Sequence, residues 1–285
     1  MAEYPPTGRF VTIDGVRMHA VVMGEGPDVV LIHGASGSLR DFTFAMAPAL
    51  ADRYRVIAID RPGFGWSDPA PEGHRLSVQA ELIRRTVAEL GAETPVVLGH
   101  SYGGAVALAW AIDAPNTMAA LVPLAAPSHS WDTGLPWLYR VTAPAPGRAV
   151  VVPLLTAWVP ERMIERAVDQ VFAPQAEPRG YAQHFGPEMT IRRKTFRTNA
   201  EQRATLKAQI TQMIASYPRL PMPVEIVHGT ADTTVGLSIH SEKLVQAIPG
   251  AVLTRLPDIG HMPHHVVMDQ VIAAIDRAAD RAGLR

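Results

Sequence analysis

The sequence predicts an α/β fold: a mostly parallel, doubly wound sheet of eight strands, with a helical segment inserted between the sixth and seventh strands. Short runs rich in Val and Ile alternate with amphipathic stretches from Phe10 to about Ala125. This alternation stops between residues 126 and 220, where prolines are frequent, and then resumes. Strands alternating with helices are typical of a parallel sheet that helices cover on both faces.

The strands can be assigned in order along the chain. A hairpin with Asp14-Gly15 in its turn is expected first, with its strands at Arg9–Ile13 and 18–23. Continuous apolar runs suit strands that are buried on both faces of a sheet. Four such runs follow, at 29–32, 56–59, 96–98 and 120–124, and strand-forming runs reappear at 224–227 and 252–256.

Three helices of the main fold are also predicted. Residues 76–90 place Leu76, Ala80, Ile83 and Val87 on one stripe, which is helical spacing. Residues 102–114 are small, apolar and helical, and an amphipathic helix from about 266 to 282 closes the chain. We therefore expect two units: a core formed by residues 1–125 and 221–285, and a helical cap, or lid, at 126–220.

Composition excludes several classes of function. The chain has 285 residues, no cysteine, and 26 Lys+Arg against 27 Asp+Glu. Disulfides, a cysteine nucleophile and thiolate metal sites are therefore excluded, and no basic footprint of a nucleic-acid binder is present. The first residues, MAEYPPTGRF, lack the apolar core of a signal peptide, and no apolar stretch is long enough to span a bilayer. We expect a cytoplasmic monomer or homodimer that does not insert stably into membranes.

The strongest functional signal is GHSYG at residues 99–103, which fits the nucleophile-elbow pattern G-x-S-x-G. A sharp strand-to-helix turn there holds the serine in a strained backbone and exposes its hydroxyl. The glycines are needed because a Cβ at either position would collide with the neighbouring strand or helix. A predicted strand precedes the motif and an Ala-rich helix follows it. Ser101 is therefore the candidate nucleophile, and a structural turn with an incidental serine is the alternative.

A serine hydroxyl needs a base that accepts its proton and a carboxylate that orients the base. His261 follows the last predicted strand and precedes the last helix, and Gly260 before it suits an exposed loop. Asp232 follows the strand at 224–227, so it emerges at the same edge of the sheet as Ser101. We therefore expect His261 as the base and Asp232 as the acid.

Other residues compete for these roles. Asp258 lies three residues before His261 and would have to fold back to reach it. His261 and His264 have the H-x-x-H spacing of a metal pair, but Pro263 disfavours the helix on which such a pair normally lies. We expect instead that one of His264 and His265 is a solvated or helix-capping side chain. No metal ion and no cofactor are expected.

A tetrahedral intermediate also needs backbone N–H donors. The sequence HGASG at 33–37 follows a predicted strand, and the N–H of Ala35 can reach over the serine. The second expected donor is the N–H of Tyr102 at a helix start, where the helix dipole favours negative charge. Structural, hydrogen-bonding roles are expected for three nearby histidines: His33, His100 and His228.

Five motifs in this order resemble the α/β-hydrolase superfamily. They are GP at 26–27 with HG at 33–34, DRPGFGWSD at 60–68, the elbow, HGTAD at 228–232, and GH at 260–261. The resemblance covers the chain from about residue 26 to the end, apart from residues 126–220. It is greatest to the branch of lidded bacterial serine esterases, to which epoxide hydrolases and haloalkane dehalogenases are related. It implies structural roles for Asp60 and Asp68.

Departures from sister groups narrow the implied activity. Dehalogenases and epoxide hydrolases of this type have aspartate at the elbow, where this chain has Ser101. Ring-cleavage C–C hydrolases usually have an aromatic residue after the catalytic histidine, where this chain has Met262. The resemblance therefore implies a carboxylesterase that forms an acyl-enzyme on Ser101 from a small-molecule ester. A C–C, amide or lactone hydrolase with the same triad is the alternative, and a ligand receptor is a third interpretation.

The segment 126–220 is expected to cover the nucleophile, because the elbow opens at the sheet edge where this segment is inserted. Its apolar residues predict a moderately hydrophobic, enclosed pocket that favours short- to medium-chain or aromatic esters over charged or polymeric ones. Five side chains are expected in this substrate pocket: Ser36, Trp137, Trp158, Val235 and Met262.

Overall fold

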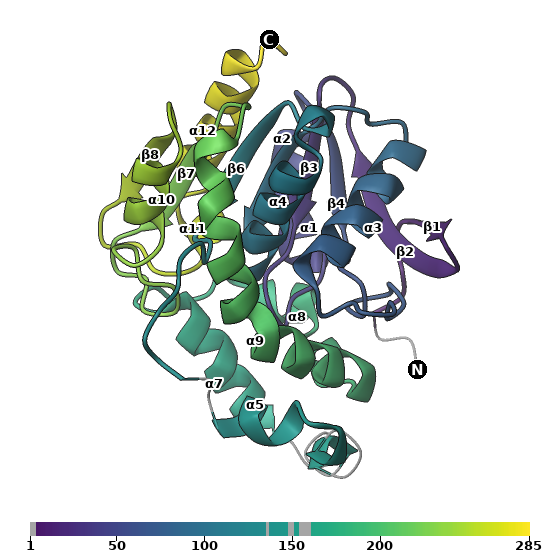
Figure 1. Cartoon of the computed structure of the whole chain (residues 1–285). Helices are drawn as coiled ribbons and strands as arrows, with labels where there is room; N and C mark the ends of the chain where they lie inside the picture. The colour runs from purple at the N-terminus through teal and green to yellow at the C-terminus, as the bar shows by residue number, and fades with distance from the viewer. Residues whose placement is uncertain (1–3, 135–136, 148–150, 154–160) are drawn as a thin grey trace.

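The fold is that of a computed structural model, which describes residues 4–134, 137–147, 151–153 and 161–285. Within these residues eight strands form one sheet (Figure 1). In chain order they are β1 (Arg9–Ile13), β2 (Val16–Met23), β3 (Asp28–Ile32), β4 (Arg55–Ile59), β5 (Val96–His100), β6 (Ala120–Leu124), β7 (Glu225–Gly229) and β8 (Val252–Leu256). All eight predicted strands are thus confirmed, with their ends displaced by at most two residues.

The order of strands across the sheet is β1-β2-β4-β3-β5-β6-β7-β8. β2 pairs antiparallel with β1 and β4, whereas the pairs from β4 to β8 are parallel. β4 lies on one side of β3 and β5 on the other, so the direction of winding changes at β3. Ligands of doubly wound sheets bind at such a switch point, outside the carboxyl ends of the strands. The loop at 33–37 and Ser101 follow β3 and β5 at this point.

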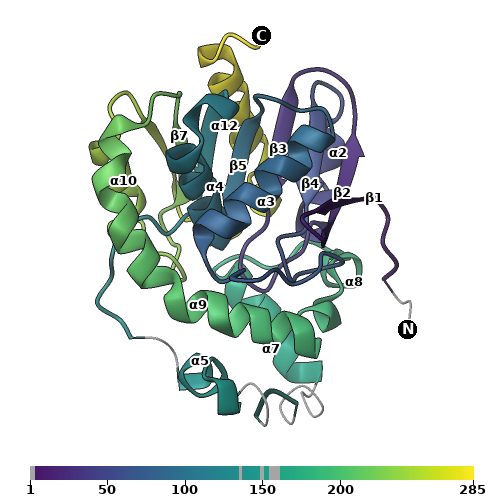
Figure 2. The same cartoon turned by 45° about the vertical axis from the view of Figure 1, so that its right-hand side comes forward.

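Helices cover both faces of the sheet, and Figure 2 shows α3 and α4 in front of it. Side chains of α3 (Leu76–Glu89), α4 (Tyr102–Asp113) and α10 (Ser241–Ala247) belong to one buried cluster. Side chains of α2 (Met46–Leu50) and α12 (Met268–Arg281) belong to the cluster on the opposite face. Three short elements complete the core: α1 (Arg40–Thr43), η1 (Pro115–Thr117) and α11 (Pro263–Val266).

The strands alternate between these two clusters. Val30 and Ile32 of β3 belong to the cluster of α3 and α4, whereas Val29 and Leu31 belong to the cluster of α2 and α12. All four side chains are fully buried. Burial on both faces explains why residues 29–32 of β3 are a continuous apolar run.

Residues 126–220, termed the insert below, lie between β6 and β7. Their named elements are all helical: α5 (Trp137–Thr142), α7 (Glu161–Phe172), α8 (Tyr181–Phe185), η3 (Pro187–Met189), α9 (Arg193–Met213) and η4 (Ile214–Arg219). Figures 1 and 2 show α5, α7 and the start of α9 gathered at one end of the sheet, away from the C-terminus. Leu206 and Ile210 of α9 join the cluster of α3 and α4, so this helix anchors the insert to the core.

The loop that carries the DRPGFGWSD motif is organised by Asp60. Its buried carboxylate accepts hydrogen bonds from the backbone N–H groups of Leu39 and Trp66, at 2.8 and 2.9 Å. Its Oδ2 also lies 2.8 Å from Nδ1 of His19 on β2. Asp60 thereby joins β2, the start of α1 and its own loop.

None of the helices in the described ranges is both long and apolar enough to cross a membrane.

Candidate active site

Ser101 lies between β5 and α4 with backbone angles of φ 50° and ψ −122°. This left-handed conformation is strained for a residue with a side chain. A Cβ at Gly99 would overlap the carbonyl of Gly103, and a Cβ at Gly103 would overlap the carbonyl of Ile32 on β3. The turn therefore needs glycine at both positions, and it places Ser101 on a cavity wall.

His261 and Asp232 form a buried hydrogen-bonded pair, with Nδ1 of His261 2.7 Å from Oδ2 of Asp232. Because the carboxylate occupies the Nδ1 edge, Nε2 is the imidazole nitrogen left for a reacting group. His261 lines the same cavity as Ser101. Asp258, the rival acid, is exposed, and its backbone N–H bonds to Thr230 Oγ1.

Four donors surround the Asp232 carboxylate. Besides His261, the backbone N–H groups of Thr234 and Val235 donate to Oδ1 at 2.8 and 2.9 Å, and Nε2 of His228 lies 3.2 Å from Oδ2. Burial alone would raise the pKa of Asp232, but the hydrogen bonds from His228, His261 and Val235 hold this pKa well below its ordinary value. The carboxylate is therefore ionised at neutral pH.

The loop at 33–37 lies directly against the elbow. A Cβ added to Gly34 would be only 3.2 Å from Cβ of Ser101. Within the described part of the chain, neither the N–H of Ala35 nor that of Tyr102 has a hydrogen-bond acceptor. Two free N–H donors beside a serine could hold an oxyanion.

A buried arginine fixes the peptide between Gly34 and Ala35. Nη2 of Arg61 donates to the carbonyl oxygen of Gly34 at 2.9 Å, and Nε donates to that of His33 at 3.0 Å. In a trans peptide the N–H points away from the preceding carbonyl. By holding the carbonyl of Gly34, Arg61 therefore sets the direction of the Ala35 N–H.

His33 adds a second donor to the same carbonyl. Its Nε2 accepts the backbone N–H of Arg61 at 2.9 Å, so the ring proton is on Nδ1, which donates to Gly34 O at 2.9 Å. Burial, with the nearby Arg61 charge, lowers the pKa of His33 to about 3, so the ring is neutral. His33 therefore acts through hydrogen bonds alone, which agrees with its expected structural role.

The guanidinium of Arg61 is held without a carboxylate partner among the described residues. Its remaining hydrogen bonds go to the amide oxygens of Gln79 and Gln202, at 2.8 and 2.6 Å. The rings of Phe64 and Tyr102 each lie 4.4 Å from its central carbon. Burial lowers the pKa of Arg61 to about 10, so it keeps its charge at neutral pH.

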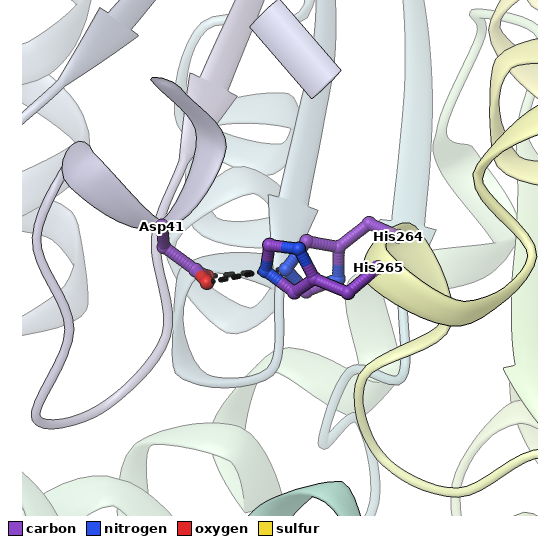
Figure 3. Close-up of side chains that lie close together, drawn as sticks. All are labelled: Asp41, His264 and His265. Atoms are coloured by element: carbon purple, nitrogen blue, oxygen red, sulfur yellow. Dashed lines mark hydrogen bonds and ion pairs between the residues drawn. The ribbon is translucent and has the colours of Figure 1, made fainter. Parts of the chain in front are cut away.

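A second buried cluster contains Asp41 and the two histidines that follow His261 in the sequence. Figure 3 shows both imidazole rings directed at the one carboxylate. Nε2 of His264 lies 3.1 Å and Nε2 of His265 2.8 Å from the oxygens of Asp41, and the hydroxyl of Tyr181 donates to the same carboxylate at 2.8 Å. The prediction that one histidine is solvated or caps a helix is therefore wrong, because both side chains are fully buried against Asp41.

These three side chains are also a possible set of metal ligands, because their donor atoms lie within 4.8 Å of one another. A histidine that binds metal normally donates its other ring N–H to an acceptor. Here the Nδ1 atoms of His264 and His265 are buried without a partner in the described part of the chain. The arrangement fits two imidazoles that donate hydrogen bonds from Nε2 to Asp41 better than it fits a metal centre.

Ser101 and His261 open onto a cavity of about 390 Å³. Its lining is mostly apolar and comes from both the core and the insert. The residues that line it are Gly34, Ala35, Ser36, Gly37, Asp41, His100, Ser101, Leu138, Ala167, Val168, Val171, Tyr181, Phe185, Pro187, Thr190, Ile191, Phe196, Arg203, His261 and Met262. A larger hollow of about 540 Å³ lies between α3, α4 and α9, but it contains none of the candidate catalytic residues.

The expected pocket residues have different outcomes. Ser36 and Met262 line the cavity as expected. Trp137 does not: it is 71% exposed at the start of α5, where its ring faces solvent, so this prediction is wrong. Val235 is buried beside Asp232 rather than in the cavity wall, because its backbone is bound to His228 and Asp232. Trp158 lies outside the described residues.

Several lining residues of the insert were not predicted. Phe196 and Arg203 of α9 line the cavity, and Asn199 between them donates to Ser36 Oγ at 2.9 Å. Spacings of three and four residues put them on one face of a helix. This spacing is visible in the sequence, but nothing local shows that this face meets the loop at 33–37.

Comparisons with known proteins agree on the fold. The family described as alpha/beta hydrolase fold matches residues 27–138, which include the elbow. A thermophilic esterase from Thermogutta terrifontis superposes with a TM-score of 0.78 at 21% identity, over 96% of this chain and 99% of that one. At this identity the likeness shows the fold alone.

Two of the curated proteins that are similar in sequence come from the genus Cupriavidus. A 2-hydroxy-6-oxononadienedioate/2-hydroxy-6-oxononatrienedioate hydrolase from Cupriavidus pinatubonensis is 29% identical over 268 residues, 90% of this chain and 89% of that protein. The dihydrolipoyllysine-residue acetyltransferase component of the acetoin cleaving system from Cupriavidus necator is 42% identical over 109 residues. The match covers 38% of this chain and only 29% of that longer protein.

We expect stability to fall steeply as the pH is lowered from about 6.5 to about 4. Burial lowers the pKa values of His240 and His264 to about 4 and that of His33 to about 3, from 6.5. In this window the unfolded chain binds more protons than the folded one, which costs about 1.4 kcal/mol per pH unit for each histidine. Urea unfolding at four pH values measures the free energy of unfolding as a function of pH. His240→Asn should reduce the slope of this dependence. A free energy of unfolding independent of pH would contradict the buried, neutral state of these rings.

We expect Arg61→Met to lower kcat for hydrolysis by about 10- to 100-fold with little change in KM, because a misdirected Ala35 N–H weakens only the transition-state contact. Arg61→Lys should recover part of the loss, since one ammonium can still reach a carbonyl. Circular dichroism and the unfolding midpoint serve as controls for folding. An equal fall in kcat in both variants, or a change in KM with kcat unaltered, would contradict the positioning role of Arg61.

Proposed function

We propose that this chain is a serine hydrolase of the α/β-hydrolase superfamily, and that it cleaves a carboxylic ester of a small to medium, fairly hydrophobic substrate. In this proposal Ser101 is the nucleophile, His261 the general base and Asp232 the acid that orients the base. The observation that carries it is the 2.7 Å contact of His261 with Asp232, on the same cavity as a serine held at φ 50°.

The proposed reaction begins at the hydroxyl of Ser101. Asp232 accepts a hydrogen bond from the Nδ1–H group of His261 and keeps its negative charge, so Nε2 can take the proton of Ser101 as its oxygen attacks the ester carbonyl. The negative charge on the carbonyl oxygen is held by the N–H groups of Ala35 and Tyr102. His261 then returns the proton to the leaving alcohol. Water, activated by the same imidazole, releases the acid from the acyl-enzyme on Ser101.

The cavity supports the proposed size and polarity of the substrate. A volume of about 390 Å³ suits a small molecule rather than a polymer. Leu138, Val168, Val171 and Phe196 of the insert supply apolar walls, and Met262 lies beside the proposed base. An ester with a short aliphatic or aromatic body would bury most of its surface there.

Cleavage of a C–C bond by the same triad is the second candidate function. The Cupriavidus pinatubonensis hydrolase, whose name gives 2-hydroxy-6-oxononadienedioate and 2-hydroxy-6-oxononatrienedioate as its substrates, is similar over 90% of this chain. Met262 stands where C–C hydrolases of this kind usually have an aromatic residue. Parallel assays with p-nitrophenyl esters and with a dienone acid separate the two activities, because only one substrate class should turn over at a useful rate.

The variant Ser101→Ala should fold normally and lose esterase activity by about 10⁴-fold or more in kcat, because no other nucleophile is held on the elbow. The wild-type protein should also form one covalent adduct with a fluorophosphonate probe, located on Ser101 by mass spectrometry. Near wild-type turnover by Ser101→Ala, or labelling elsewhere, would overturn the proposal.

Asp232→Asn should lower kcat by about 10²- to 10⁴-fold, because an amide stabilises the wrong tautomer of His261. Asp258→Asn is the matched control, since this carboxylate is exposed and His261 Nδ1 is bonded to Asp232 instead, and it should change kcat by less than about tenfold. Steady-state kinetics of both variants on one p-nitrophenyl ester decide the matter. The opposite ranking would assign the acid to Asp258.

A further inference from the structure

One charged side chain of the cavity has no role in the proposed reaction. Apart from histidines, the lining contains two residues that are charged at neutral pH, Asp41 and Arg203. Asp41 is saturated by Tyr181, His264 and His265. Arg203, by contrast, has no carboxylate or carbonyl within hydrogen-bond distance among the residues described here. The cavity therefore contains an apolar wall with one cation whose N–H groups are available.

The position of Arg203 follows from contacts around Asn199, one turn earlier on α9. Asn199 binds Ser36 twice: its Nδ2 donates to Ser36 Oγ at 2.9 Å, and its Oδ1 accepts the N–H of Ser36 at 3.2 Å. Ser36 adjoins Ala35, a proposed oxyanion donor. Nδ2 of Asn199 also lies 3.5 Å from the hydroxyl of Tyr139.

The guanidinium of Arg203 lies over the ring of Tyr139. The central carbon of Arg203 lies 4.7 Å from the centroid of this ring. Stacking on an aromatic ring covers one face of a guanidinium but leaves its N–H edges free to bind a planar anion. The cation therefore lies on the same wall as the loop at 33–37, within the reach of a small molecule bound at Ser101.

We propose that the substrate carries one carboxylate, in addition to its scissile ester and apolar body, and that Arg203 binds this carboxylate. Guanidinium and carboxylate form paired, charge-assisted hydrogen bonds, which strengthen where apolar walls exclude water. This inference rests on the proposed serine-hydrolase function and names its substrate class. It also revises the sequence-based expectation that the pocket disfavours charged esters: one anionic group is accepted, and indeed selected.

Two matched pairs of substrates test the inference, one for each side of the ester bond. The first pair is mono-p-nitrophenyl adipate and its methyl ester, which differ in a charge on the acyl side. The second pair is 4-carboxyphenyl butyrate and its methyl ester, which differ in a charge on the alcohol side. In at least one pair the wild-type protein should have a kcat/KM about tenfold or more higher for the carboxylate. The preference should weaken as salt is raised.

Variants show whether Arg203 is the source of the preference. Arg203→Met keeps an unbranched stem but removes the charged guanidinium. In the pair that shows the preference, the ratio of kcat/KM for the carboxylate to that for its methyl ester should therefore fall to about one, mainly through KM. Arg203→Lys should retain part of the preference. Arg193→Met is the matched control, because Arg193 is exposed on the same helix and does not line the cavity. It should leave the ratio unchanged.

The outcomes separate this inference from the proposed function. If the fluorophosphonate labels Ser101 and the neutral esters turn over, but neither pair shows a preference that Arg203→Met removes, only the carboxylate site is wrong. If Ser101 is not labelled and no ester turns over, the proposed function fails, and the inference fails with it. A preference that Arg193→Met also abolishes would assign it to the general field of α9 rather than to Arg203.

Discussion

The left-handed backbone of Ser101 is the constraint on which the site depends. The strained turn persists because β5 lies between β3 and β6, and the N–H of Ser101 donates to Leu124 O at 2.9 Å. Gly103 lets α4 start directly against the end of β3. The same close approach brings the loop at 33–37 against the serine. The elbow and the two free N–H donors are thus one consequence of packing α4 onto β3.

Three buried charged groups, Asp232, Asp41 and Arg61, are each surrounded by hydrogen-bonding partners. The Asp232 and Asp41 carboxylates are surrounded by donors, whereas Arg61 is held by carbonyl and amide oxygens between two aromatic rings. An incompletely solvated ion in the interior would cost several kcal/mol. These shells also connect distant segments, because each contains groups far apart in the chain. The stability of the core and the geometry of the site therefore depend on the same contacts.

The core and the insert contribute different properties to the cavity. Ser101, Asp232, His261 and the N–H of Ala35 come from loops at the carboxyl edge of the sheet, and the second N–H donor is at the start of α4. Apolar walls and the cation come from the helices of the insert. Asn199 joins the two parts by its paired hydrogen bonds to Ser36. A change in the insert can therefore alter substrate preference while the sheet keeps the reacting groups in place.

The sequence by itself determined the eight strands and their order along the chain, the helices of the core and the glycine elbow at Ser101. Periodicity and the steric needs of glycine are local properties, so they can be read from neighbouring residues. It also placed Asp232 and His261 at one sheet edge, because parallel strands end together. Only the tertiary structure decided that His264 and His265 share Asp41, that Trp137 faces solvent, and that Arg203 reaches the cavity. Each of these depends on which distant segment lies opposite, and that is set by packing rather than by local pattern.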